Sequence, residues 1–130
     1  AAGVAEGTNA NTYKTSNTLV YTSDGVFKSK AAINNVAFSA GHTVVPVSST
    51  CLFGVWIDAA GTFSTSQGAI VPSGDQKPFP VAPAADLTCV GLIQVTTNAA
   101  VTFTAGSTDL SATGITDAYF DVSRMPSNNF

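Results

Sequence analysis

Charged residues are scarce in this chain, at only 10% of its 130 residues, against roughly 25% in typical soluble domains. Five Lys and Arg stand against eight Asp and Glu, so the net charge is −3. This balance argues against a surface that follows the phosphates of a nucleic acid. Because 45% of the residues are hydrophobic, global disorder is excluded. We therefore expect one folded, acidic domain with no nucleic-acid partner.

Long apolar runs are missing as well. No stretch approaches the roughly 18 to 20 residues that a transmembrane helix needs, so we expect no membrane partner. The N-terminus, Ala1-Ala2-Gly3-Val4, lacks the basic and apolar regions of a secretory signal. This start favours an intracellular product that has lost its initiator Met, although a signal cleaved upstream would leave the same start.

Cysteine is limited to Cys51 and Cys89, each at the start of an apolar run. Two cysteines in a chain of this length do not make a disulfide scaffold. We favour two buried free thiols that act as small hydrophobic residues, while a bridge between neighbouring strands stays open. No CxxC or Cys/His cluster with zinc spacing occurs, so we predict no metal site.

Motifs for catalysis are absent too. His42 is the only histidine, it follows Gly41 in a predicted surface loop, and no GxSxG elbow accompanies it. No Walker loop, GxGxxG or DxDxDG pattern is present. The acids are Glu6, Asp24, Asp58, Asp75, Asp86, Asp109, Asp117 and Asp121. Turns account for Asp24 and Asp58, and polar stretches hold Asp109 and Asp117. We predict no catalytic residue, no cofactor and no enzyme.

Short strands separated by turns dominate the rest of the chain. Residues 18–22 and 26–28 flank Asp24-Gly25, which is a strong hairpin signal. Residues 51–57 are continuously apolar, which predicts a strand covered on both faces. Asp58-Ala59-Ala60-Gly61 fits a type I turn that leads into an alternating run over 62–65.

Weaker patterns fill the remaining segments. A second strand–turn–strand unit is predicted over 89–95, 96–100 and 101–104, and a last strand over 118–122. Residues 31–38 fit a strand or a loop, and Pro46 confines the run 43–47 to an edge or a bulge. The further predictions are a long surface loop over 71–83, one helical turn over 109–114 and a tail over 124–130.

These patterns predict an all-β fold, an antiparallel β-sandwich or jelly roll, with an extended N-terminal arm. We place the arm at residues 1–17 and a single β-domain at 18–130. The expected inner faces carry Val20, Phe27, Leu52, Val55, Ile57, Leu92, Val95, Phe103 and Phe120. Trp56 is expected in the core.

Several segments resemble small virion proteins of tailed bacteriophages. The likeness spans roughly residues 18–126 and is carried by residues 21–31, 52–62, 79–83 with 90–95, and 103–117. These are loose turn-and-strand patterns such as Tyr21-Thr22-Ser23-Asp24-Gly25-Val26-Phe27 and Leu52-Phe53-Gly54-Val55-Trp56-Ile57-Asp58. The resemblance implies a capsid decoration (cement) protein or a fibre component, with no catalytic residues to transfer.

For this chain, the resemblance implies a β-domain, often trimeric, that binds the major capsid protein on the outer shell at junctions between capsomers. It would then be a virion protein, assembled in the host cytoplasm. The scarcity of charge agrees, because permanent association desolvates charges at a cost.

Two alternatives remain, a phage fibre or receptor-binding module and a carbohydrate-binding domain. The latter would use Trp56, Tyr13 and Tyr21 as stacking residues. Under the cement hypothesis, we expect deletion of residues 1–16 to weaken attachment to the shell and leave the domain folded.

Overall fold

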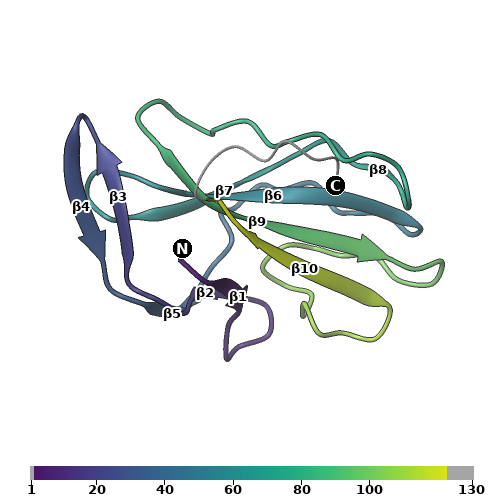
Figure 1. Cartoon of the computed structure of the whole chain (residues 1–130). Coiled ribbons are helices and arrows are strands. Elements are labelled where there is room, and N and C mark those ends of the chain that lie inside the picture. Colours follow the sequence, from purple (N-terminus) through teal and green to yellow (C-terminus); the bar gives the residue numbers. More distant parts are fainter. Residues whose placement is uncertain (1, 123–130) are drawn as a thin grey trace.

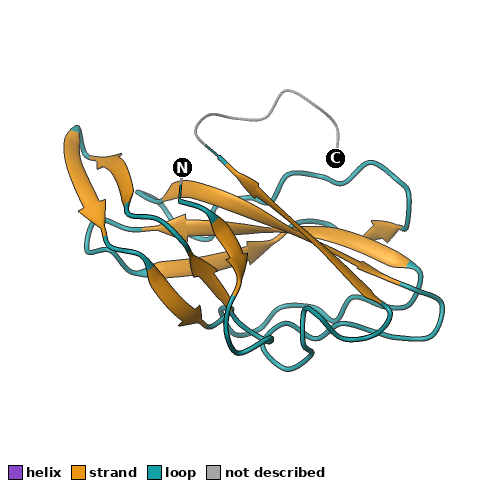
Figure 2. Cartoon of the chain, turned by 60° about the horizontal axis from the view of Figure 1, so that its bottom comes forward, coloured by secondary structure: helices purple, strands orange, loops and turns teal. Residues whose placement is uncertain are grey.

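The structure, a computed structural model, describes residues 2–122, which form ten β-strands and no helix (Figures 1 and 2). The predicted tail over 124–130 lies outside the described residues. None of the described residues belongs to a helix that could cross a membrane. The strands are β1 (Val4–Glu6), β2 (Tyr13–Thr15), β3 (Leu19–Ser23), β4 (Val26–Lys30), β5 (Ile33–Val36), β6 (Ser49–Ile57), β7 (Phe63–Gln67), β8 (Val71–Pro72), β9 (Thr88–Thr97) and β10 (Ile115–Asp121).

The largest sheet has the strand order β10-β9-β6-β7, with β8 paired to the start of β6. All of its pairings are antiparallel. The turn between β6 and β7 forms as its sequence predicts. Gly61 N–H donates to the Asp58 carbonyl at 3.1 Å, and the Asp58 carboxylate accepts from the backbone of Ala60 and Thr62.

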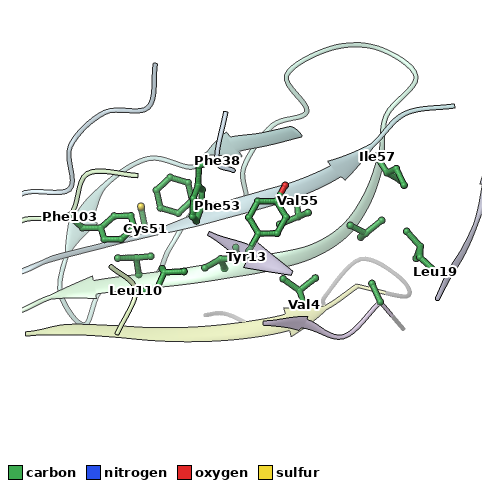
Figure 3. Close-up of a cluster of buried hydrophobic side chains, with 14 of the residues drawn as sticks. Val4, Tyr13, Leu19, Phe38, Cys51, Phe53, Val55, Ile57, Phe103 and Leu110 are labelled. Atoms are coloured by element: carbon green, nitrogen blue, oxygen red, sulfur yellow. The ribbon is translucent and has the colours of Figure 1, made fainter. Parts of the chain in front are cut away.

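A three-stranded sheet, β1-β2-β5, packs on one face of this large sheet. The shared core includes Val4, Tyr13, Phe53 and Ile93, and Phe38 makes edge-to-face contacts with both Tyr13 and Phe53 (Figure 3). The all-β class and the antiparallel sandwich are therefore confirmed.

The second face of the large sheet is covered by irregular chain. Every residue of β6 is buried, and Leu52, Trp56 and Leu92 are buried outside the main core cluster. Pro80 is buried too, and a Cβ added at Gly54 would stand 2.9 Å from Pro80 Cγ. The irregular chain over 73–87, named here the covering segment, thus lies against this face at Pro80. The predicted surface loop over 71–83 also completes the core.

The extended N-terminal arm is not confirmed. Residues 1–17 supply β1 and β2, and Ala2, Val4, Tyr13 and Thr15 are all buried. Asp121 Oδ1 also accepts from the backbone N–H groups of residues 3 and 4, at 2.8 and 3.1 Å. Strands of three residues are too short to show a period in the sequence, so the sequence gives no sign of β1 and β2.

Some of the finer predictions are wrong. The hairpin is present, but its Val20 and Phe27 are 67% and 79% exposed and not in the core. Residues 101–104 form only an isolated bridge, between Phe103 and Val45. Residues 109–114 form turns and no helix, and Phe120 is half-buried. The other expected core residues, Leu52, Val55, Ile57, Leu92, Val95 and Phe103, are fully buried.

Deletion of residues 1–16 is now expected to prevent folding, contrary to the expectation for a free arm. The truncation removes β1 and β2 and bares the core side of β6 and β9. Circular dichroism in the near-ultraviolet and amide NMR dispersion would measure the loss, with removal of Ala1 alone as control. A truncated chain that keeps native amide dispersion would show that residues 1–16 form an arm outside the folded domain.

Replacement of Gly54 by Ala is expected to destabilise the protein by about 1–3 kcal/mol, as overpacking of a core does. The added methyl would stand 2.7 Å from Trp56 Nε1 and 2.9 Å from Pro80 Cγ. Denaturant unfolding would measure the change, with Ser73→Ala on the exposed loop as control. If Gly54→Ala is as stable as wild type, the covering segment moves aside for the added methyl group without a measurable loss of stability.

Candidate interaction surface

The β3–β4 hairpin is the most exposed apolar element among the described residues. Asp24 and Gly25 adopt φ of 52° and 75°, the left-handed pair that a two-residue type I′ turn requires. The turn pairs Ser23 with Val26 and fixes the register to Leu19 and Lys30 at the far end. The hairpin forms its own two-stranded sheet at one end of the sandwich (Figure 1).

One face of the hairpin holds it on the domain. Leu19 and Tyr21 are buried, and the Tyr21 hydroxyl donates to the Asp58 carbonyl at 2.8 Å. Thr88 Oγ1 also donates to the Thr22 carbonyl, at 3.1 Å. The hairpin is therefore anchored to the ends of β6 and β9.

The other face points away from the domain. It carries Val20, Thr22, Phe27 and Ser29, which are all exposed and uncharged. Val26, near the tip, is 56% exposed. Exposed apolar groups that gather on one element mark an interaction site more often than single exposed residues do. We name Val20, Thr22, Phe27 and Ser29 the hairpin face.

His42 is not the free surface residue that the sequence suggests. It is half-buried, its ring meets that of Phe53 edge to face at 5.3 Å, and its Nε2 lies 2.7 Å from Thr65 Oγ1. The same Thr65 oxygen accepts from the backbone N–H of Ser39. Burial lowers the pKa of His42. The sequence gives no sign of these contacts, because they join a loop to an edge strand 23 positions away.

Both cysteines are free thiols. Cys51 lies opposite Val95 and Cys89 opposite Trp56, near the two ends of β6. Burial raises the pKa of Cys51 to about 11, and it raises the pKa of Cys89 as well. At neutral pH both sulfurs are thereby held in the weakly nucleophilic thiol form.

The three aromatic residues considered for carbohydrate stacking are buried. Tyr13 is fully buried, and Tyr21 and Trp56 are each only 7% exposed. Trp56 Nε1 donates to Ser66 Oγ at 2.8 Å beneath the covering segment. These residues therefore offer no platform to a sugar ring in this structure.

The acidic side chains that make contacts hold other parts of the fold in place. Asp58 caps a turn, and Asp121 accepts from the backbone N–H groups of Gly3 and Val4 at the start of β1. Asp117 accepts from the Tyr119 hydroxyl at 2.7 Å, and burial together with this bond raises the pKa of Tyr119. Within residues 2–122, no three His, Cys, Asp or Glu side chains gather as metal ligands would.

Comparison with known proteins finds no matching family model, no matching curated protein and no matching solved structure.

Acidification is expected to destabilise the fold through His42. Its pKa is lower in the folded protein than the ordinary value of 6.5, so the unfolded chain binds the proton first as pH falls. Its contribution to stability is complete above about pH 6.5 and declines below that pH, until the folded pKa is reached.

Thermal unfolding of wild type and His42→Gln between pH 8 and pH 5 would measure this effect. The variant keeps a polar side chain without the titration, so its stability should fall less over this range. If the stability of the two proteins falls equally with pH, His42 does not contribute to the loss of stability in acid.

Proposed function

We propose that this chain is a non-enzymatic virion structural protein that decorates the outer capsid surface and stabilises the shell. It binds the major capsid protein at capsomer junctions, and the hairpin face forms the contact. The observation that carries the proposal is the exposure of Val20 and Phe27 on an anchored hairpin.

The apolar hairpin face supports attachment to another protein. Burial of a Val or Phe side chain contributes about 1.5–3 kcal/mol. The hairpin is already held on the domain by Leu19 and Tyr21, so little additional ordering opposes binding. Its face carries no charge, which makes desolvation inexpensive.

The positions of the reactive groups also support a structural role. The cysteine pKa values are raised, His42 packs on Phe53, and three candidate stacking residues are buried. The carbohydrate-binding alternative gains no stacking platform from these residues. The resemblance to small phage virion proteins supports the capsid as partner and a trimer as assembly.

The proposal predicts that capsids produced without this protein bind it when it is added back and become more resistant to heat. Genome release on heating and co-sedimentation with the particles would measure both effects. The double variant Val20→Ser, Phe27→Ser should bind at least about tenfold more weakly, because it removes most of the apolar contact.

Val81→Ser provides a matched control. Val81 is 80% exposed and lies in the covering segment, outside the hairpin face, so this variant should bind like wild type. No binding of the wild-type protein to deficient shells would overturn the proposal. If Val81→Ser and the double variant lose binding to the particles equally, the hairpin face is not the contact, and that part of the proposal is wrong.

A further inference from the structure

The β4 strand has a free hydrogen-bonding edge. In a hairpin with a two-residue loop, the residues that flank the loop form a hydrogen-bonded pair, and the pairs then alternate. Val26, Lys28 and Lys30 therefore direct their backbone groups toward β3, whereas Phe27 and Ser29 direct theirs outward. Among the described residues no strand pairs with this edge, which lies at one end of the molecule (Figures 1 and 2).

The side chains along this edge alternate in character. Phe27 and Ser29 belong to the uncharged hairpin face, while Lys28 and Lys30 belong to the opposite face. Neither lysine makes an ion pair or side-chain hydrogen bond with another of residues 2–122. Two of the five cationic residues of an acidic chain are thus placed two positions apart on one free strand.

The geometry points to a specific occupant for this edge. Resting on the proposed function, we infer that β4 receives an extended, antiparallel strand of the partner protein. In this strand an acidic residue lies opposite Lys28, and apolar residues lie opposite Phe27 and Ser29.

Pairing geometry gives the reason for this alternation. The added strand would exchange backbone hydrogen bonds with Phe27 and Ser29, so its residue opposite Lys28 falls in a non-hydrogen-bonded pair. Such pairs have the shorter Cα separation, about 4.5 Å, which brings a carboxylate close to the ammonium group. The flanking residues then fall on the side of the hairpin face, beside Phe27 and Ser29.

A peptide of defined sequence tests the inference without any capsid. The probe is acetyl-Thr-Glu-Val-Glu-Val-Glu-Thr-amide, titrated into the isotope-labelled full chain and followed by amide NMR. We expect the largest shifts at Phe27 and Ser29. The same peptide with Lys in place of Glu, and one with N-methylated Val amides, should each bind at least about tenfold more weakly.

Protein variants separate charge from backbone pairing. Lys28→Glu should reverse the preference, so that the Lys peptide binds more tightly than the Glu peptide. Ser29→Pro removes an outward N–H and should abolish binding, whereas Ser29→Ala keeps that N–H and should bind like wild type. Melting curves would verify that each variant is folded.

Absence of shifts on β4, or an unchanged preference in Lys28→Glu, would overturn the inference. The capsid experiment distinguishes this failure from failure of the proposed function. If particles bind wild type, Lys28→Glu and Ser29→Pro equally, the strand-pairing mode is wrong and decoration stands. If the peptide binds as expected but deficient particles do not bind the protein, decoration is wrong and the strand site on β4 stands.

Discussion

Burial of β6 on both faces is the constraint on which the rest of the structure depends. All residues from Ser49 to Ile57 are buried, and β9 together with β7 and β8 satisfies the backbone on both edges. Side chains of a strand alternate between faces, so one half of β6 needs cover from each side. The core shared with β1 and β2 covers Phe53 and Val55, and the covering segment lies over Gly54. The hairpin with its free edge lies at one end of this sheet, where Asp58 and Thr88 hold it.

Short polar side chains hold the loops against this centre. Ser39 and Thr65 exchange two bonds, each donating its backbone N–H to the hydroxyl of the other at 2.9 Å. Thr97 Oγ1 accepts from Ser49 N–H in a buried position. A hydrogen bond of this kind contributes on the order of 1 kcal/mol. The low charge of the sequence is therefore also suited to the interior of the protein. Hydroxyls and amides pair with the backbone at positions where charged side chains would be costly to bury.

The elements predicted correctly are those with a strong local signal. Asp24-Gly25 dictates a type I′ turn, and the continuous apolar run before Asp58 dictates a doubly covered strand. The face of the hairpin could not be predicted, because residues 19–21 are all apolar and only packing decides which of them points inward. The bridge at Phe103 depends on a partner, Val45, that is distant in the sequence.

The candidate surface follows from the same ambiguity. Val20 and Phe27 look like core residues in the sequence, but the burial of Leu19 and Tyr21 against the domain turns them outward. The one available signal was the pairing register: Phe27 pairs with Thr22 and Val20 with Ser29, which gives that face two hydroxyls. Contacts of His42 with Thr65 and Phe53 had no signal in the sequence at all.

The covering segment has a consequence for the dynamics of the protein. Irregular chain held by few backbone hydrogen bonds opens at a lower free energy than a paired strand does. Its release would uncover β6 around Gly54 and Trp56, where Pro80 packs, while β6 stays paired with β9. The protein thus has a concealed apolar surface that becomes accessible through a local fluctuation. Self-association under mild stress would then begin from this nearly native species, well before the sheets separate.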